Sequence, residues 1–479
     1  MSAATAVIVG GGVTGLSTAY WLARKRYGRV ILLEKGPVGD GSSSRAAAII
    51  TGLLWSETGV LARNVSLRLF RELSEELDGY SFQAVGCLNL FDPASWPERA
   101  ALLPLYERCG APFEILDAAE MRARWPELHP SDTFTGLYDP LGGYSEPDDY
   151  IPALARKCRE LGVEIREQQQ VEEIVLRGGR VAGVRTAAGL IEADAVVSTV
   201  YAWTNLLLER IDLRLPVKAF VHQRYVTEPL PAPLAIPAVN ANPLGGYIRP
   251  ASGGRLLAGI ESADRSEHRV STPDFHLSAL VAPAALKDQI RANVTPYLPA
   301  LGSVGWASDK VGLLTFAIDG EPIVGPVGRL PGLLLASPSV LGASPITQSP
   351  ACCWPSSWPT AAPASMCAPS HRTVSTWTRR TPTWRRRWRR RMSCGGGIRA
   401  SPPGRWRRSA GRPRRASQPR GRRGRLRGEE RRPGWRRQSP GQRRYGTPGA
   451  AAMRSSGSCA SDGPPHKVGG ELDENGLHS

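Results

Sequence analysis

Apolar residues near the start of the chain form short runs that do not alternate with polar residues. The first run covers residues 6–9, and a second run covers residues 30–33. Such runs are typical of parallel strands buried on both faces, because alternation is lost when neither face meets water. A stretch with apolar residues at helical spacing lies between them, at 13–23. The pattern therefore predicts a strand, a helix and a second, parallel strand.

The same reasoning predicts further helices and strands up to residue 337. Helical spacing recurs at 62–77, 98–109, 118–125, 150–161 and 280–297. Strand-like runs occur at 84–91, 163–165, 171–176, 181–186, 195–197, 217–227, 245–250, 255–259, 305–316 and 333–336. For the helix at 150–161 we expect Asp148 or Asp149 as the N-cap and Gly162 after the end.

The order of these elements predicts an α/β fold with two interleaved domains and a tail. Helix–strand units typical of a parallel sheet recur after stretches with other predicted elements, which indicates one domain interrupted by insertions. The expected α/β domain comprises residues 1–85, 143–215 and 311–337. The expected second domain, an antiparallel sheet with helices, comprises 86–142 and 216–310, and the tail comprises 338–479.

Three glycines connect the first predicted strand to its helix. Gly10, Gly12 and Gly15 fit the pattern G-x-G-x-x-G. Gly10 allows a tight turn, Gly12 leaves room for a pyrophosphate, and Gly15 allows the helix to lie close to the strand. The free N–H groups of the first helical turn, at Val13 and Thr14, would face the phosphates. The motif therefore predicts a dinucleotide site.

An acidic residue ends the second predicted strand, where it can support that site. Glu34 lies about 20 residues after the glycines, at the usual place for an acid that binds ribose hydroxyls, and Lys35 follows it. The next loop carries small hydroxyl donors and a cation, Ser42, Ser43, Ser44 and Arg45. This loop could hold the pyrophosphate from the side opposite the helix. The alternative is a solvated glycine-serine loop.

The formal net charge of +18 is confined to the C-terminal part of the chain. Residues 345–479 contain 28 Arg and 1 Lys against 6 acidic residues, whereas residues 1–344 contain 32 basic and 37 acidic residues. The body is therefore mildly acidic, and its charge does not indicate a nucleic-acid partner.

Cysteine spacing and hydropathy argue against a metal site, a disulfide framework and a membrane span. Cys87, Cys109 and Cys158 are scattered through the body without metal-ligand spacing. No apolar run approaches the length of a bilayer, and the N-terminus lacks the basic start of a signal peptide. We therefore expect a cytoplasmic protein without metal or membrane partners.

Several segments together resemble the FAD-dependent amino-acid oxidase superfamily, which includes D-amino-acid oxidase, glycine oxidase and sarcosine oxidase. The resemblance covers residues 5–337 and is nearest to the sarcosine oxidase and dimethylglycine dehydrogenase branch. The segments that carry it are GGGVTGLSTAYWLA from Gly10, GDGSSSR from Gly39, AVVSTVYAW from Ala195, GYIRP from Gly246, GGRLLAG from Gly253 and DGEPIVGPV from Asp319.

The resemblance implies a Rossmann-like FAD-binding domain interleaved with an α+β substrate domain. It places the three glycines at the pyrophosphate and Glu34 at the adenosine ribose. It places Ser43, Ser44 and Arg45 near the phosphates and the flavin, Val171 at the adenine through backbone contacts, and Trp203 near the flavin.

Three departures from the family pattern matter. Val200 and Tyr201 stand where the family commonly has Ala-Gly, which would crowd the site. No His lies within 36–60 and no tail Cys stands in a matching motif, so we expect non-covalent FAD. The glycine-rich loop that normally follows the last strand is missing after Ser337. That loop normally opens a helix facing the flavin.

The tail differs in kind from the body. Phe is absent after Phe316, and no Lys occurs between Lys310 and Lys467 although Arg is abundant. This bias suggests a GC-rich gene read out of frame from about Ser337, a hypothesis that sequencing the gene tests. The alternative is a genuine arginine arm that binds single-stranded nucleic acid or an acidic membrane face. Either reading predicts disorder.

The chemistry implied is oxidation of a small amino acid or N-methylated amino acid, such as glycine, sarcosine or dimethylglycine. A hydride would pass to flavin N5, and oxygen or an electron-transfer acceptor would reoxidise the flavin. Arg249 with Tyr247 is the candidate pair for the substrate carboxylate. Arg249 could instead be a surface strand residue and Tyr247 a core residue. His222 and Arg224 share a strand face and could line the same pocket.

Two other classes of function stay open at this point. An NAD-dependent dehydrogenase shares the glycine motif but not the later segments. A nucleic-acid-binding protein would depend on the tail alone.

Overall fold

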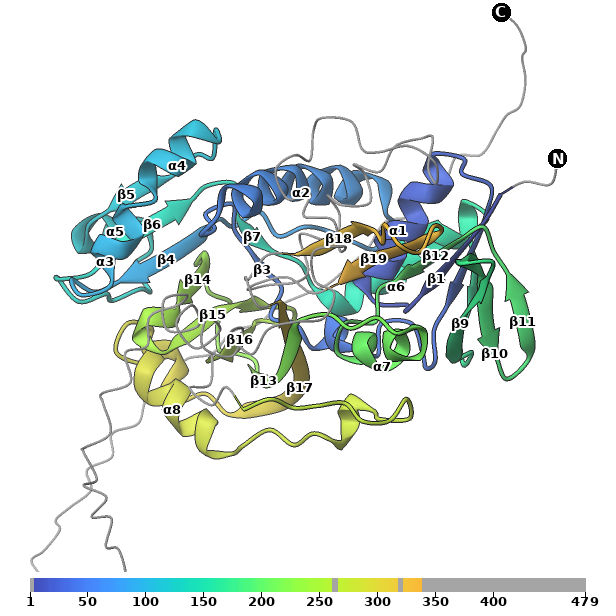
Figure 1. Cartoon of the computed structure of the whole chain (residues 1–479). Helices are drawn as coiled ribbons and strands as arrows, with labels where there is room; N and C mark the ends of the chain where they lie inside the picture. Colours follow the sequence, from blue (N-terminus) through green and yellow to red (C-terminus); the bar gives the residue numbers. More distant parts are fainter. Residues whose placement is uncertain (1–3, 261–265, 318–321, 338–479) are drawn as a thin grey trace, which may run out of the picture. The chain divides into compact units, whose positions relative to one another are not determined.

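The computed structural model describes residues 4–260, 266–317 and 322–337. One of the two large sheets has six strands, several of which are labelled in Figure 1. Its strands, in spatial order, are β18 (Ile323–Pro326), β19 (Leu333–Ser337), β12 (Ala195–Ser198), β1 (Thr5–Val9), β2 (Arg29–Leu33) and β8 (Glu164–Arg166). All neighbours pair in parallel except β18 and β19. The fold is thus α/β, as predicted.

Both faces of this sheet are buried, which explains why its strands lack alternation. On one face, Ile8 packs in a cluster with residues of α1 (Val13–Arg24) and α6 (Pro147–Glu160). On the other face, Val7 packs in a cluster with residues of the three-stranded antiparallel sheet. The strands of that small sheet are β9 (Val171–Arg177), β10 (Arg180–Thr186) and β11 (Gly189–Glu192).

The start of α6 differs from the prediction. The helix begins at Pro147, so Glu146 occupies the N-cap position and Asp148 and Asp149 lie in the first turn. Proline is tolerated there because the first N–H groups of a helix have no intrahelical partner. The carboxylate of Glu146 does not cap the helix and instead binds Arg249.

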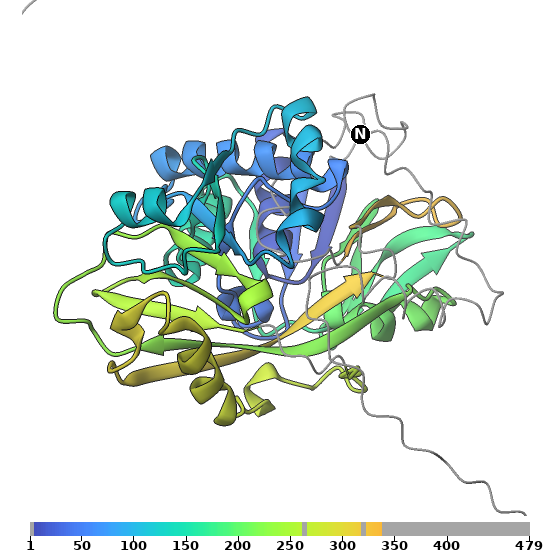
Figure 2. The same ribbon diagram turned by 90° about the vertical axis from the view of Figure 1, so that its left-hand side faces the viewer.

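The second large sheet has eight strands from two distant parts of the chain. In spatial order they are β17 (Trp306–Ala317), β13 (Val217–Thr227), β16 (Arg255–Gly259), β15 (Gly246–Ala251), β14 (Ala238–Ala241), β4 (Cys87–Phe91), β6 (Thr135–Asp139) and β5 (Glu114–Leu116). The long strands β13 and β17 lie side by side (Figure 2). We predicted an antiparallel sheet, and the correction is that β14 and β4 pair in parallel.

The remaining described α-helices confirm three predictions in outline and correct their limits. They are α2 (Glu57–Glu76), α3 (Trp96–Ala100), α4 (Leu103–Arg108), α5 (Ala118–Arg124), α7 (Thr204–Leu208) and α8 (Ala285–Val294). The single helix predicted at 98–109 is two short helices, because Ala101 and Leu102 interrupt it before Pro104. Helix α2 starts earlier than predicted because the side chain of Ser56 accepts a hydrogen bond from Gly59 N.

A few short elements were not predicted from the sequence. Strands β5, β6 and β11 are three to five residues long, and β3 (Ile49–Ile50) and β7 (Gly143–Tyr144) form a two-residue pair. Such short strands carry too few positions to show a period of two.

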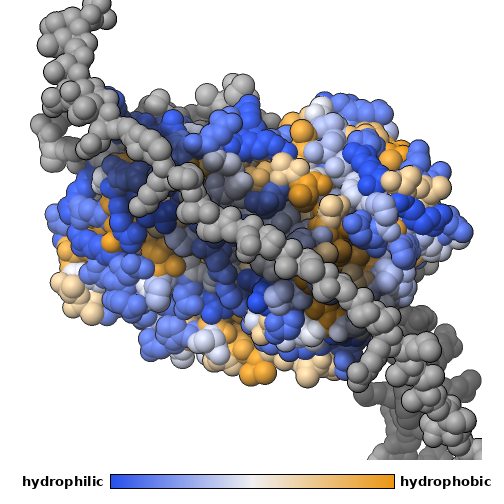
Figure 3. Space-filling view, turned by 180° about the vertical axis from the view of Figure 1, so that it is seen from behind, coloured by the Kyte–Doolittle hydropathy of each residue, from blue (hydrophilic) through white to orange (hydrophobic). Residues whose placement is uncertain are grey.

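Exposed apolar side chains come from separate elements. The large exposed ones are Leu61, Ile115, Leu141, Leu161 and Val281. On the face shown in Figure 3, hydrophobic residues lie in several places between larger hydrophilic areas. None of the helices within the described ranges is long and apolar enough to cross a membrane. The predicted domain boundaries stay a prediction, and the tail lies outside the described residues.

Candidate cofactor and substrate site

A cavity of about 400 Å³ lies where residues of the two large sheets meet. From the six-stranded sheet and its loops it is lined by the glycine turn, the end of β2 and the loop at 40–55. From the eight-stranded sheet it is lined by residues at the end of β4 and on β13, β14, β15 and β17. Its size is in the range of small-molecule and cofactor sites.

The glycine turn has the geometry that the motif predicts. Gly10 has a φ of +107°, which side chains rarely adopt, and its N–H donates to Leu33 O at 2.8 Å. A Cβ on Gly15 would overlap the carbonyl oxygen of Gly10, so helix and turn are in direct contact there. Gly12 lines the cavity, and a Cβ there would meet only Ser43 Oγ, at 3.0 Å. The turn therefore offers backbone to a ligand at Gly10 and Gly12, whereas Gly15 serves packing.

Glu34 lines the cavity and braces this turn. Its Oε2 accepts a hydrogen bond from Gly11 N at 2.7 Å, and its Oε1 accepts one from Gly36 N at 3.0 Å. Each carboxylate oxygen has a second lone pair, which a ribose hydroxyl can use. The predicted place of Glu34 at the end of β2 and beside the glycine turn is thus the observed one.

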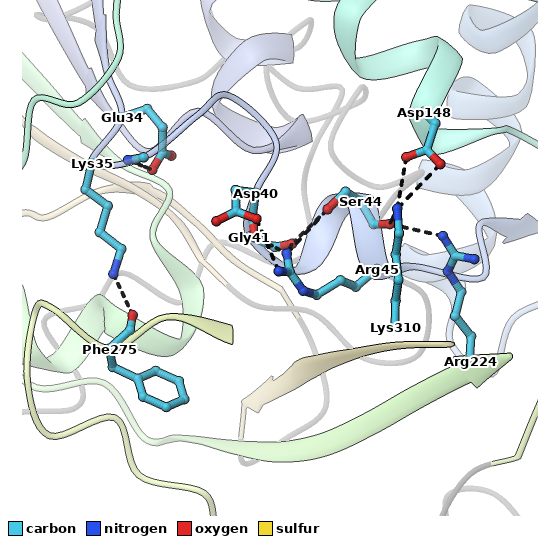
Figure 4. A network of polar contacts seen from close by, with 11 residues as sticks. Glu34, Lys35, Asp40, Gly41, Ser44, Arg45, Asp148, Arg224, Phe275 and Lys310 are labelled. Atoms are coloured by element: carbon cyan, nitrogen blue, oxygen red, sulfur yellow. Dashed lines mark hydrogen bonds and ion pairs between the residues drawn. The ribbon is translucent and has the colours of Figure 1, made fainter. Parts of the chain in front are cut away.

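Lys35 also lines the cavity, but its ammonium group is bound to protein. Its Nζ donates to Phe275 O (Figure 4) and to Pro273 O, both at 2.7 Å, and lies 4.5 Å from the centre of the Trp203 ring. Burial lowers the pKa of Lys35. Lys35 therefore fastens the segment 273–277, which also lines the cavity, to the end of β2.

The serines of the loop that follows β2 do not all line the cavity. Ser43 Oγ accepts a hydrogen bond from Val13 N at 3.0 Å, so it caps the first turn of α1 from outside the helix. Ser42 lines the cavity and donates to Leu313 O at 2.9 Å. Ser44 is not among the lining residues, and its hydroxyl donates to Gly41 O at 3.4 Å.

Arg45 lines the cavity, but its guanidinium turns back toward its own loop. It donates to the carbonyl oxygens of Asp40 and Gly41 and pairs with Asp40 Oδ1 at 3.1 Å (Figure 4). The role of Arg45 at the phosphates stays a prediction.

Two cations from the eight-stranded sheet hold this loop in place. The carbonyl oxygen of Ser44 accepts hydrogen bonds from Arg224 Nη2 at 3.1 Å and from Lys310 Nζ at 3.3 Å (Figure 4). Lys310 also pairs with Asp148 Oδ1 at 3.1 Å. Of the two residues expected to share a strand face, His222 lines the cavity and Arg224 does not.

Val171, the first residue of β9, and Trp203, which follows β12, both line the cavity. Their contacts with adenine and flavin stay predictions. Tyr201 lines it too, with a φ of +40°, and its hydroxyl lies 2.9 Å from Thr14 Oγ1. The tyrosine therefore lies against the first turn of α1, where the phosphates were predicted.

The structure separates the two residues that were predicted to bind the substrate carboxylate. Tyr247 lines the cavity, and its hydroxyl lies 2.9 Å from Nε2 of His222. Arg249 is 0% exposed and is not among the lining residues. Its Nη1 and Nη2 bind the carboxylate of Glu146 at 2.8 and 3.0 Å, and its Nε donates to Ala47 O. It is thus neither a surface residue nor placed to meet a ligand.

Two buried arginines that line the cavity were not predicted from the sequence. Arg63 lies on the apolar face of α2, three residues after Val60 and seven before Phe70. Arg99 lies in the last turn of the short helix α3 and is also buried. The available signal was a charged residue at an apolar position of a helical pattern. Within the described ranges, no three His, Cys, Asp or Glu side chains are grouped so as to hold a metal ion.

Comparison with known proteins gives a consistent result. The family model described as "DAO: FAD dependent oxidoreductase" matches residues 5–354. Sarcosine oxidase subunit beta of Arthrobacter sp is 32% identical over 263 residues, which are 53% of this chain and 64% of that protein. The 4-methylaminobutanoate oxidase (formaldehyde-forming) of Paenarthrobacter nicotinovorans is 28% identical over 345 residues, 69% of this chain and 40% of that protein.

A solved structure is similar over most of the described part of the chain. The crystal structure of glycine oxidase from Geobacillus kaustophilus is 27% identical, with a TM-score of 0.61, over 72% of this chain and 91% of that chain. This chain spans less than two thirds of the length of either sequence relative named above.

Proposed function

We propose that this chain, which belongs to the family of FAD-dependent oxidoreductases, oxidises the carbon–nitrogen bond of a small amino acid or N-methylated amino acid. The observation that carries the proposal is the continuity of one cavity. The same cavity is lined by the glycine turn with Glu34 and by the Tyr247–His222 pair of the other sheet. A dinucleotide in the first part would therefore meet a small substrate in the second.

The chain's own residues fit the cofactor FAD. Gly12 leaves the space that a pyrophosphate needs, and the N-terminus of α1 offers it a positive dipole end. Glu34 can accept hydrogen bonds from the ribose hydroxyls, and Val171, the residue expected at the adenine, lines the same cavity. The predicted family and cofactor are confirmed, and the NAD-dependent alternative is not carried further.

When bound, FAD supplies the acceptor for the hydride at N5 of its ring. The chain must then hold the substrate so that the carbon next to nitrogen faces that position, and must keep the amine neutral. Tyr247 and His222 can do the second task, because a hydroxyl 2.9 Å from an imidazole nitrogen can pass a proton to it. The pair would thus take the proton of the substrate ammonium. The resulting imine would hydrolyse in water.

Non-covalent binding of FAD stays part of the proposal. Cys87, Cys109 and Cys158, the cysteines of the described part of the chain, do not line the cavity, whereas His222 and His276 do. Acid precipitation tests this point: FAD should remain in the supernatant. Flavin that stays with the precipitated protein would indicate a covalent bond, with the two histidines as candidates.

Several further expectations remain proposals. The reoxidant would be oxygen or an electron-transfer acceptor, and the location would be cytoplasmic, although relatives include the mitochondrial sarcosine dehydrogenase of Homo sapiens. Nucleic-acid binding and the out-of-frame hypothesis both concern the tail, which lies outside the described residues.

The experiment that tests the function uses the full chain reconstituted with FAD. Anaerobic mixing with glycine, sarcosine or N,N-dimethylglycine should bleach the visible absorbance of the flavin. N,N,N-trimethylglycine is a matched control, because its quaternary nitrogen has no lone pair to assist departure of the hydride. A flavin-loaded protein that none of the three amines reduces would refute the proposed substrate class.

A further inference from the structure

Arg99 is a buried cation at the cavity wall. Its side chain is 4% exposed, and the residue lines the cavity. Its Nη1 donates to Leu53 O at 3.1 Å and to the hydroxyl of Tyr106 at 2.7 Å. Its Nε is buried and has no hydrogen-bond partner. Part of the guanidinium's donor capacity is therefore unused.

Two aromatic rings lie close to this guanidinium. Its central carbon lies 4.0 Å from the centre of the Trp55 ring and 5.3 Å from that of Phe91. Both aromatic residues also line the cavity. Stacking on an aromatic face stabilises the cation but leaves its edge, which carries the N–H donors, available to a planar acceptor.

No carboxylate in the described part of the protein forms an ion pair with Arg99. Arg63, a second buried guanidinium of the cavity wall, has its pKa lowered by burial to about 10, so it is still a cation at neutral pH. Among the described residues, the charged groups that act on Cys87 are Arg63, Arg99 and Asp139.

The carboxylate of Asp139 is already hydrogen-bonded within the protein. Asp139 accepts hydrogen bonds from Thr51 Oγ1 and from the backbone N–H groups of Gly52, Leu141 and Gly142. Glu98, next to Arg99, lines the cavity but is exposed and forms no ion pair with it within the described ranges. A buried guanidinium is costly without an anion, so an anionic ligand would be strongly favoured here.

We propose that Arg99 binds the carboxylate of the substrate, the role that the sequence had suggested for Arg249. This inference rests on the proposed function and names the residue that would select for the substrate carboxylate. The substrates would be amino acids with a free carboxylate, and amines without one would be excluded. A planar carboxylate matches the fork of a guanidinium, and a site built for that contact discriminates against a ligand that lacks it.

The test uses an unreactive pair of probes and two substitutions. Methoxyacetate has an ether oxygen in place of the amine nitrogen of sarcosine, and 2-methoxyacetamide is its uncharged counterpart. Binding is measured by isothermal titration calorimetry on the full chain, with and without FAD. Arg99→Met removes the charge but keeps most of the side-chain volume, and Arg99→Lys keeps the charge but loses the fork. Arg108→Met, on the exposed side of α4, is the matched control.

The expected result has three parts. Wild-type protein binds methoxyacetate at least tenfold more tightly than the amide. Arg99→Met removes that preference, Arg99→Lys retains part of it, and Arg108→Met retains all of it. Affinity for FAD is unchanged in every variant, which separates the effect from a damaged cofactor site.

Two results would overturn the inference. One is equal affinity of wild-type protein for the acid and the amide, which needs no variant to fold. The other is a folded Arg99→Met protein with undiminished preference for the acid. A chain that binds methoxyacetate through Arg99 but never takes up FAD would refute the proposed oxidase function while leaving this inference intact.

Discussion

The hydroxyl of Tyr201 lies 2.9 Å from Thr14 Oγ1, and so a bulky side chain lies against the first turn of α1. Tyr201 adopts a φ of +40°, a region that costs a residue with a Cβ about 1–2 kcal/mol and costs glycine almost nothing. The position therefore suits glycine, the residue that is common there in the family that this sequence resembles. The tyrosine narrows the part of the cavity where the phosphates are expected.

Replacing Tyr201 with Gly should strengthen FAD binding. We expect about a tenfold lower dissociation constant, equivalent to about 1.4 kcal/mol, because space is released where the phosphates are expected. Fluorescence titration with FAD measures it. Tyr201→Phe, which removes only the hydrogen bond, should change the constant less. Weaker binding of FAD by Tyr201→Gly would mean that the tyrosine supports the cofactor.

Replacing Gly15 with Ala should damage the fold and the cofactor site together. The new methyl would overlap the carbonyl oxygen of Gly10, so strand and helix must separate. Overpacking of this kind costs about 1–3 kcal/mol. Urea unfolding and FAD titration should both register the change. Gly328→Ala is the control, because a Cβ there meets nothing within 4 Å. Normal FAD affinity in Gly15→Ala would contradict the packing argument.

Removing the Tyr247 hydroxyl should slow reduction of the flavin without weakening FAD binding. Tyr247→Phe loses the contact to His222 Nε2, and acid–base groups of this kind contribute about 10²–10⁴-fold to a rate. Stopped-flow absorbance with the best substrate gives the rate constant. Tyr225→Phe serves for comparison, since that hydroxyl binds Pro283 O and does not line the cavity. An unaltered rate in Tyr247→Phe would remove the pair from the mechanism.

Replacing Arg249 with Met should lower stability rather than substrate affinity. The change leaves the Glu146 carboxylate without its bidentate partner, and breaking a buried ion pair on one side costs about 3–5 kcal/mol. The free energy of unfolding in urea measures the loss. Arg255→Met, at a half-exposed pair with Glu228, should cost far less. A stable Arg249→Met protein with reduced methoxyacetate affinity would return Arg249 to the substrate site.

Acid should weaken the contact between β2 and β8 through Glu164. Hydrogen bonds from Arg29 and Arg166 lower the pKa of Glu164 to about 2. The ionised form is thus favoured by folding, so its contribution is present above about pH 4.5 and is lost as the pH falls toward 2. The side chain is 40% exposed, so solvent screening limits the contribution to about 1 kcal/mol or less.

Urea unfolding of Glu164→Gln at pH 7 and pH 3 tests this pH dependence. The variant should be less stable than wild type at pH 7 and closer to it at pH 3. Glu172→Gln, at an exposed position of β9, provides the reference. Equal differences at both pH values would show that the Arg29 contact contributes no acid sensitivity.

Local sequence predicted the part of the cavity that we propose for the cofactor, because the contacts there are local. Gly10, Gly12 and Gly15 act through backbone geometry within one turn, and Glu34 reaches that turn from the adjacent strand. The part that we propose for the substrate depends on which strand faces the cavity after eight strands have assembled. Arg249 and Arg99 look alike in the sequence, and only the positions of Glu146 and Trp55 distinguish a neutralised arginine from an available one.

The limit of a helix was predicted where a characteristic residue type marks it, and it was missed where no such residue does. Gly162, with a φ of +84°, follows the end of α6 as predicted. The break between α3 and α4 was missed, because the apolar residues on both sides keep helical spacing. The lone parallel pair β4–β14 could not be foreseen either, since it joins segments from different predicted pieces of one domain.

The pairing of β4 with β14 also constrains when the protein can fold during its synthesis. Asn89 of β4 and Asn240 of β14 are 151 positions apart, yet their side chains are hydrogen-bonded. During synthesis, one edge of β4 has no strand to pair with until the ribosome has produced β14. The nascent polypeptide thus exposes an aggregation-prone strand edge for a long interval, and its yield in cells should depend on chaperones that shield this edge.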